Sequence, residues 1–440
     1  MSLLDPIPSL LVEEESAAFL RRAFHHARIV GNFALIQAGV QILGFLSGIL
    51  IVRTLSQHEY AYFTIANSMQ ATISMLADVG IGVGLVSIGG RVWPDRHRFG
   101  ELINTALRAR RQLAVAAIAI VTPILYVMLS KNGAPVFQTV VLIALVLISM
   151  SIELSVGVLG VVPRLHSDIA RIQLIDSTGA LVRLIILLAL VYTLFLNASI
   201  AVAVATGTFL LQYLMLRKYA GKVVDLSAPE NPEDRRAIFG FTRKLAANTL
   251  FYCFQGQITV FLISFFARQA TSVAEVGALG RLAMIFTVLS TLLTNIFVPA
   301  VARCQDHRKL RWLYAAIVGA VVAFSMVVLA CAAILPEAFL FVLGNKYAHL
   351  HRELLFMVAA AVVAALTGTF WALNASKAWI AGAWLYVPLT LGTQIALIPF
   401  TDFSTVTGVL LFNLFSALPN LFLNIGMSYH GFRSFRLAIA

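Results

Sequence analysis

Charged residues are scarce in this 440-residue chain, and their scarcity argues against a soluble fold. Asp, Glu, Lys and Arg make up 12% of the residues, whereas hydrophobic residues make up 60%. A typical soluble domain carries roughly twice that share of charged residues, about 25%. The hydrophobic residues fall instead into about twelve runs of roughly 19–30 residues, each long enough to cross about 30 Å of hydrocarbon as a helix. The composition therefore predicts a membrane protein.

Several functional signatures are missing as well. The apolar runs lack the alternation of polar and apolar residues that a transmembrane β-barrel requires, so we expect helices. Three cysteines, Cys253, Cys304 and Cys331, provide neither a disulfide framework nor a metal-ligand spacing. The histidines form no H-x-x-x-H pair within a run, and no glycine-rich loop of the Walker type leads into a helix. We therefore expect no metal site, no ATP-driven chemistry and no cofactor other than a coupling Na⁺ or proton.

The order of the apolar runs predicts two lobes of six transmembrane helices each. The predicted spans are 29–52, 61–90, 112–130, 136–163, 172–196, 198–216, 245–267, 277–302, 313–335, 354–374, 378–398 and 404–428. The longest polar stretch follows the sixth span. The predicted parts are an N-terminal segment (1–28), an N-lobe (29–216), a linker (217–244), a C-lobe (245–428) and a tail (429–440). The first 28 residues contain Glu13–Glu15 and no cleavage site of a secretory signal. An amphipathic surface helix and a disordered tail both remain open for them.

The basic residues indicate how the chain is oriented. About 25 of the 32 Lys and Arg residues lie in segments on the same side of the membrane as the N-terminus. The excess of positive charge on cytoplasmic loops therefore predicts that both termini are cytoplasmic. It also accounts for the net charge of +12 without a nucleic-acid partner, and it predicts attraction to anionic lipid headgroups.

The two predicted halves resemble each other. Phe45–Arg53 (FLSGILIVR) and Val260–Arg268 (VFLISFFAR) both end at an arginine that precedes a short polar connection. The next span of each half also ends at an arginine, Arg91 or Arg303. Repeated halves are common in transporters, whose substrate sites lie between the halves near the bilayer midplane. Six helices in each half imply a parallel repeat about an axis along the membrane normal.

The segment Arg53–Phe63 (RTLSQHEYAYF) resembles the R-x-L-s-x-x-e-Y-G-x-Y signature of Wzx-type polysaccharide and O-antigen flippases. These belong to the multidrug/oligosaccharidyl-lipid/polysaccharide (MOP) exporter superfamily. Asp78–Gly82 (DVGIG) matches the family's D-x-G-x-G. Ala61 and Phe63 depart from the usual Gly and Tyr, and the acidic residue common in the seventh span is absent near Thr259. The resemblance implies an all-α, MATE-like polytopic membrane protein with a V-shaped central cavity, located in the bacterial inner membrane.

Four ionisable residues lie inside predicted spans of the N-half: Asp78, Glu153, Asp176 and Arg183. Placing each of these side chains in the membrane costs about 2.5–3.5 kcal/mol on insertion scales, so each needs a structural or functional reason. Arg183 follows Asp176 by about two helical turns and leans back towards it, which favours a buried neutralising cluster. Alternatively, Arg183 binds an anionic lipid diphosphate, and Asp78, Glu153 or Asp176 binds the coupling proton or Na⁺. The sequence leaves both interpretations open.

The C-half contributes further candidate residues. Arg281, about one turn from the outer end of its span, is either an interfacial anchor or a cation facing the cavity at an outer gate. Arg243 and Lys244 either fix the topology or form an entry funnel for phosphate. Uncharged polar side chains on the first helix of each half would hydrogen-bond sugar hydroxyls or join helices. These cavity-lining candidates are Asn32, Gln37, Gln41, Asn248, Gln255 and Gln257.

Together these observations predict a flippase that moves an undecaprenyl-diphosphate-linked oligosaccharide, an O-antigen or exopolysaccharide repeat unit, by ion-coupled alternating access. The alternatives are a cation-coupled multidrug antiporter of the same superfamily and a non-transporting polysaccharide-assembly or polymerase subunit. The predicted outer connections are too short for the catalytic platform of an enzyme, so no enzymatic activity is expected. The expected partners are the lipid-linked oligosaccharide, membrane lipids and the polysaccharide polymerase and chain-length machinery.

Overall fold

The computed structural model describes residues 35–437 except 167, 194, 268, 305 and 381. The predicted segment 1–28 and the candidate Asn32 lie outside the described residues, and so do the side chains of Lys244 and Asn248. All regular secondary structure in the described residues is helical. The expected all-α fold is therefore confirmed.

The N-lobe begins with a helical span, Leu35–Thr54. The helices that follow are α2 (Gln57–Ala77), α3 (Ile81–Val92), α4 (Arg96–Lys131), α5 (Val136–Leu159), α6 (Val161–Leu165), α7 (Ile169–Tyr192) and α8 (Ala198–Val223). Several of these helices begin at a polar side chain that accepts a hydrogen bond from a backbone N–H of the first turn. These N-caps are Ser56 for α2, Asp95 for α4, Asp168 for α7 and Asn197 for α8.

The C-lobe begins with a 35-residue helix, α9 (Pro232–Phe266). It continues with α10 (Thr271–Leu282), α11 (Ile285–Leu292), the π-helical turn η1 (Leu293–Phe297), α12 (Val298–Arg303), α13 (His307–Ile334), α14 (Pro336–Leu343), η2 (Asn345–Tyr347), α15 (His351–Ser376), η3 (Ala383–Leu385), α16 (Tyr386–Leu397), η4 (Ile398–Phe400) and α17 (Val406–Leu437). Asn231 and Asp306 cap α9 and α13 in the same way as the caps of the N-lobe.

Eleven helical segments of the described residues are long and apolar enough to span a membrane. The predicted second span, 61–90, differs from the expectation because it is two helices, α2 and α3. The chain turns between them at Asp78–Gly80, where Gly80 adopts a φ of +71°. A Cβ on Gly80 would lie 3.1 Å from backbone atoms of Phe241. Both the backbone conformation and the close approach to α9 therefore favour glycine at this position.

Further differences concern the bounds and the continuity of the helices. The predicted eighth span, 277–302, is broken into α10, α11, η1 and α12. The predicted linker, 217–244, is largely helical, because α8 continues to Val223 and α9 starts at Pro232. Pro388 lies in the first turn of α16, where the missing N–H breaks no helical hydrogen bond. Pro419 does lie inside its helix, α17.

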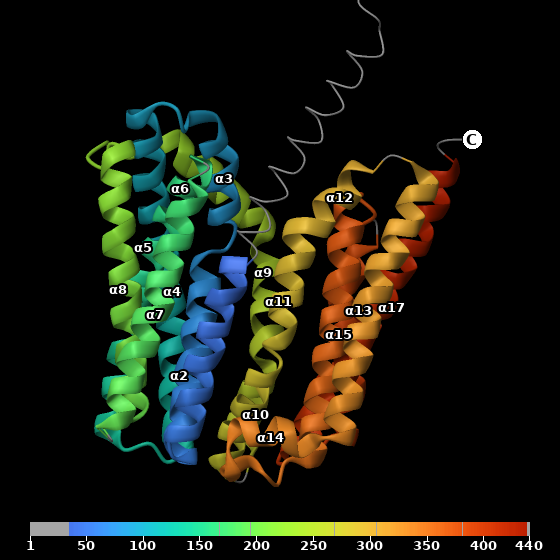
Figure 1. Ribbon diagram of the computed structural model, residues 1–440. Coiled ribbons are helices and arrows are strands. Elements are labelled where there is room, and N and C mark those ends of the chain that lie inside the picture. The colour runs from blue at the N-terminus through green and yellow to red at the C-terminus, as the bar shows by residue number, and fades with distance from the viewer. Residues whose placement is uncertain are drawn as a thin grey trace, which may run out of the picture.

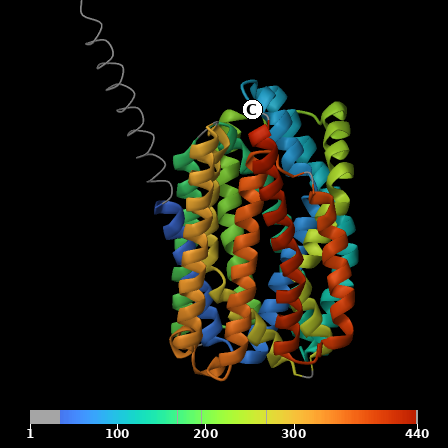
Figure 2. The same ribbon diagram turned by 90° about the vertical axis from the view of Figure 1, so that its right-hand side faces the viewer.

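The helices form two bundles that approach each other at one end and diverge towards the other (Figure 1). We call the first the closed end; it contains Arg53–Tyr60, Thr271–Arg281 and Phe341–Tyr347. At the opposite, open end lie the start of α13 and the end of α17, next to the C-terminus (Figures 1 and 2). A cluster of buried apolar residues joins the two lobes near the closed end, with Ile65 and Ala66 of α2 and Val273 and Leu279 of α10 among its members.

The packing of α4 shows how a membrane helix presents two different faces. Ala117, Val121 and Leu125 are buried and recur every fourth residue, so they form one stripe along the helix. Val115 and Ile120 on other faces are 67% and 59% exposed. Apolar side chains this exposed are suited to contact with lipid tails, whereas the stripe holds α4 against its neighbours.

Candidate functional site

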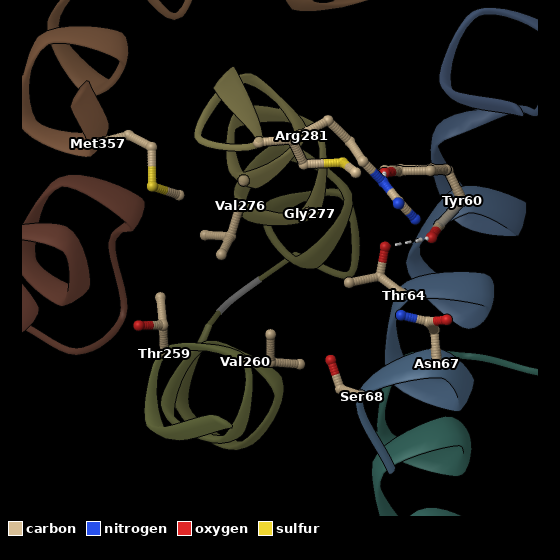
Figure 3. Close-up of a pocket in the computed structure, with 12 residues that line it drawn as sticks. Tyr60, Thr64, Asn67, Ser68, Thr259, Val260, Val276, Gly277, Arg281 and Met357 are labelled. Atoms are coloured by element: carbon tan, nitrogen blue, oxygen red, sulfur yellow. Dashed lines mark hydrogen bonds between the residues drawn. The ribbon is translucent and has the colours of Figure 1, made fainter. Parts of the chain in front are cut away.

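A cavity of about 260 Å³ lies between the two lobes on the closed-end side of the molecule. Figure 3 shows that α2 lines one wall, while residues of α9 and α10 and Met357 of α15 line the others. The lining is mixed: Val260, Val276 and Met357 are apolar, whereas α2 contributes hydroxyl and amide groups. Arg281 is the charged side chain among the described residues that line it.

Arg281 reaches across the cavity from α10 to α2. Its Nε donates to the hydroxyl oxygen of Tyr60 at 3.3 Å, and its guanidinium lies 5.9 Å from the ring centre of Phe63. A Cβ on Gly48 of the first span would lie 3.4 Å from the Arg281 side chain. Arg281 is therefore a cation that faces the cavity at the contact between the lobes. This position favours the cavity-facing role over that of an interfacial anchor.

The cavity wall on α2 consists of Tyr60, Thr64, Asn67 and Ser68 (Figure 3). Their spacing of three and four residues places them on one helical face. Thr64 donates to the carbonyl oxygen of Tyr60 at 2.8 Å, whereas the side chain of Asn67 is exposed although its neighbours in the chain are buried. These residues were not among the predicted site residues, although a polar stripe in an otherwise apolar helix is a usable signal.

Arg183 on α7 and Arg281 on α10 belong to different lobes but lie at matching depth. Arg183 is about 14 Å from the closed-end terminus of α7, and Arg281 is about 15 Å from that of α10, at 1.5 Å per residue. The charge that acts on Arg183 is that of Arg281. The Nε of Arg183 is buried and has no hydrogen-bond partner, and no ion pair involves Arg183 in the described part of the chain. Within the described residues, Arg183 is therefore influenced by a second cation and has no carboxylate partner.

The expected neutralising cluster around Arg183 is wrong. Asp78 pairs instead with Arg110, whose Nη2 lies 2.6 Å from the Asp78 carboxylate. Glu153 accepts a hydrogen bond from Gln70 at 2.9 Å and adds a second negative charge near Arg110. The prediction placed Arg110 in a loop, but α4 extends from Arg96 to Lys131 and carries it into the bundle.

Asp176 also lies apart from Arg183. The cation that acts on it is Arg164, at the end of α6. The seven-residue spacing between Asp176 and Arg183 was correctly read as one helical face, but it does not bring the two charges into an ion pair. Each of the three candidate carboxylates therefore has a nearby arginine other than Arg183.

The Asp78–Arg110 pair lines a second cavity, of about 710 Å³, together with Arg164. Arg110 also donates to the carbonyl oxygen of Leu154 at 3.1 Å. A Cβ on Gly157 would lie 2.3 Å from Arg110 Nη1, so the guanidinium occupies space that only glycine leaves free. This arrangement holds Arg110 in one position and leaves the Asp78 side chain 43% exposed to the cavity.

The remaining candidates are dispersed. Gln255 accepts a hydrogen bond from Gln394 of α16 at 2.8 Å, so it joins two helices of the C-lobe. Gln257 is half-buried on the same helix, and Arg243 is exposed nearer its start. Gln37 and Gln41 are half-buried on the first span. Within the described residues, none of these five side chains lines the closed-end cavity.

The lobes are fastened to each other at the closed end by two cations. Arg53 Nε donates to the carbonyl oxygen of Val342 at 3.0 Å, and its Nη2 donates to that of Phe341, in the last turn of α14. In return, Lys346 Nζ donates to the carbonyl oxygens of Arg53 at 3.0 Å and Leu55 at 2.7 Å, at the end of the first span. The last carbonyls of a helix lack partners and carry partial negative charge. Each cation therefore caps a helix of the opposite lobe, and we call these contacts the reciprocal caps.

Close packing of α2 against α10 accompanies these caps. A Cβ on Gly277 would lie 2.4 Å from the hydroxyl oxygen of Thr64. Gln57 adds a hydrogen bond to the carbonyl oxygen of Lys346 at 3.2 Å. The closed end is therefore sealed by helix packing, by charge-assisted hydrogen bonds and by Arg281 itself.

Comparisons with known proteins identify the fold. No protein-family model and no curated protein sequence matches the chain. Among solved structures, it is similar to a multidrug resistance MATE family transporter of the MOP superfamily in an inward-facing conformation, with 14% identity, coverage of 92% of this chain and 100% of that one, and a TM-score of 0.70. It is also similar to the eukaryotic MATE transporter AtDTX14, with 12% identity, coverage of 96% and 100%, and a TM-score of 0.64.

A third solved structure has the opposite conformation. An outward-facing MATE family transporter structure of the same superfamily gives 14% identity, coverage of 93% and 96%, and a TM-score of 0.58. The chain therefore has the fold of MATE transporters, and its TM-score to the inward-facing structure is higher than that to this outward-facing structure. The expected fold class is confirmed. These matches do not distinguish the flippase from the multidrug transporters.

Proposed function

We propose that the protein is a membrane transporter that moves a lipid-linked oligosaccharide by alternating access, and that its cavity binds the diphosphate of that lipid. The observation that carries the proposal is the pair Arg183 and Arg281, which approach each other from opposite lobes without a carboxylate partner. Guanidinium groups match phosphate oxygens in geometry and charge. A diphosphate between them would satisfy both cations and contact both lobes at once.

The same charge arrangement argues against a cationic cargo. A cationic drug in the closed-end cavity would meet Arg281 directly and would lie near Arg183. The nearest carboxylate candidates of the N-lobe, Asp78 and Glu153, already have partners in Arg110 and Gln70. Exposed polar groups of the cavity, above all the Asn67 amide, suit the hydroxyl groups of a sugar.

The direction of transport follows from the orientation that the basic residues predict. If both termini are cytoplasmic, the open end faces the cytoplasm and the closed end faces outwards in a bacterial inner membrane. The diphosphate and sugar would then enter between the lobes from the inner leaflet while the lipid tail stays in the bilayer. Outward release requires the reciprocal caps and the α2–α10 contact to open.

The Asp78–Arg110 pair is our candidate for ion coupling. Asp78 faces a cavity of the N-lobe, and Glu153 and Arg110 lie beside it. Binding of a proton or Na⁺ at Asp78 would weaken its pairing with Arg110 and shift the packing of α4 against the α2–α3 turn. In this way, binding of an ion in the N-lobe would influence the angle between the two lobes.

Translocation in proteoliposomes tests the proposal. Fluorescent undecaprenyl-diphosphate oligosaccharide would be followed from one leaflet to the other with wild-type protein, Arg183→Gln and Arg281→Gln, with and without imposed Na⁺ and proton gradients. The matched control is Arg352→Gln, which removes a closed-end arginine that packs over Phe356 of its own helix at 5.6 Å.

We expect wild type and the control to move the lipid, and each cavity variant to lose at least tenfold in rate, because a hydrogen bond to a charged group contributes about 1.5–3 kcal/mol. Equal translocation rates for all four proteins would show that neither Arg183 nor Arg281 takes part in transport. Gradient-driven movement of cationic dyes without any movement of the lipid would replace the proposal with a multidrug antiporter.

A further inference from the structure

The largest of the cavities described lies far from the central site, at the open end of the C-lobe. It has a volume of about 1150 Å³ and lies between the first turns of α13 and the last turns of α17. Both helices are on the face of the C-lobe turned away from the N-lobe, which faces the viewer in Figure 2. A ligand here would therefore be reached from the surrounding bilayer and not through the space between the lobes.

Three arginines line this cavity: Arg308 and Arg311 on α13 and Arg433 on α17. Arg308 and Arg311 are one turn apart on the same helical face, and Arg433 comes from a different helix. All three side chains are exposed, and no ion pair in the described part of the chain involves them. The nearest acidic residue in the sequence, Asp306, uses its carboxylate to accept the backbone N–H groups of Arg308 and Lys309. The three arginines outnumber this one carboxylate, so the cavity presents a net positive charge.

Aromatic side chains surround the arginines. Trp312 and Tyr429 are 73% and 72% exposed, and both line the cavity. Exposed Trp and Tyr at the ends of membrane helices mark the level of the lipid headgroups. The cavity thus lies at the depth in the membrane at which the lipid phosphates border the upper part of the lipid tails.

Packed aromatic side chains form the floor of the cavity. The Tyr314 ring packs against Phe432 with centroids 5.1 Å apart, and Phe432 packs against Trp379 at 4.7 Å. The Tyr314 hydroxyl lies 3.0 Å from Asn374 Oδ1 and 2.7 Å from Ser428 Oγ, so its polar end is satisfied within the protein. These contacts pack α13 against α17 beneath the arginines.

We propose that this cavity is a binding site for the phosphate headgroup of an anionic phospholipid, held by Arg308, Arg311 and Arg433 with Trp312 and Tyr429 beside its glycerol and upper chains. Arginine forms paired hydrogen bonds to phosphate oxygens and loses little hydration on binding. Basic pockets between membrane helices are suited to anionic lipid headgroups. The site is independent of the transported lipid, because it opens on the face away from the closed-end cavity.

Native mass spectrometry of the purified full chain tests this site, with dioleoylphosphatidylglycerol as probe and dioleoylphosphatidylcholine as the zwitterionic comparison. The variant is Arg308→Gln/Arg311→Gln/Arg433→Gln. The matched control, Arg217→Gln/Lys218→Gln/Lys222→Gln, removes three exposed cations near the end of α8 that line no cavity described here. Thermal unfolding of each protein with phosphatidylcholine alone establishes that the variants fold.

We expect the wild type and the α8 control to retain phosphatidylglycerol in preference to phosphatidylcholine, and the arginine variant to bind it about 100-fold more weakly. Competition with inorganic phosphate tests whether the bound phosphate group belongs to a lipid or to a soluble anion. Displacement of the lipid by micromolar phosphate would overturn the lipid assignment in favour of a soluble anion. Equal retention of phosphatidylglycerol by the arginine variant and the control would overturn the site.

Discussion

Removing both reciprocal caps should open the closed end. In the double variant Arg53→Gln/Lys346→Gln, the last turns of α14 and of the first span each lose the cation contributed by the opposite lobe. These side chains are largely exposed, so we assign about 1 kcal/mol to each cation and about 2 kcal/mol to the pair. That free energy corresponds to about a 30-fold shift between the two states. An outward-open state populated at about 1% would rise to roughly a quarter of the molecules.

The assay is labelling of Asn67→Cys by a membrane-impermeant maleimide added from the closed-end side. The background replaces Cys253, Cys304 and Cys331, so that the introduced thiol is the one that reacts. Asn67 is exposed to the closed-end cavity and becomes reachable from this side when the lobes separate. The control is again Arg352→Gln. No increase in the labelling rate of the double variant, or an equal increase in the control, would refute a role of the caps in closure.

Three further predictions concern individual positions. Gly277→Val should raise the same labelling rate because its Cβ would lie 2.4 Å from Thr64 Oγ1, whereas Gly280→Ala, with no atom within 4 Å of its Cβ, should not. Gly157→Ala should lower the thermal midpoint by displacing Arg110 from Asp78, at a cost of about 1–3 kcal/mol, and Gly207→Ala is the control with free space around it. Hydrogen bonds from Ser227 and then His97 lower the pKa of Asp225 to about 2. The stability that Asp225 contributes is therefore present above pH 4 and lost as the pH falls towards 2, and Asp225→Asn should abolish this part of the pH dependence of the melting temperature.

The sequence predicted the membrane class and the helical content, because both depend on composition and on the length of apolar runs. It also predicted the two-lobe architecture, through the repeat and the resemblance. It did not predict the break between α2 and α3 at Gly80. That break depends on the approach of the Phe241 backbone, and such a long-range contact has no local signal.

Candidate side chains were predicted less well than the fold for a similar reason. Arg183 was correctly selected as unusual, but its helical spacing to Asp176 was taken as evidence of pairing. The two arginines come together only when the lobes pack, because they are on α7 and α10. Arg110 was assigned to a loop because the apolar run begins only after it, at residue 112, whereas the helix already begins at Arg96. Asn67 and Thr64 were overlooked because uncharged polar residues carry little cost in a hydropathy profile.

The central claim is that the cavity between the lobes recognises the diphosphate of a lipid. The most direct test is equilibrium binding of undecaprenyl diphosphate and of a cationic dye to wild type and to the Arg183→Gln/Arg281→Gln variant in the same detergent. We expect wild type to bind the diphosphate lipid more tightly than the dye and the variant to lose at least 100-fold in affinity for the lipid alone. Tighter binding of the dye by wild type, with no loss of lipid affinity in the variant, would contradict it.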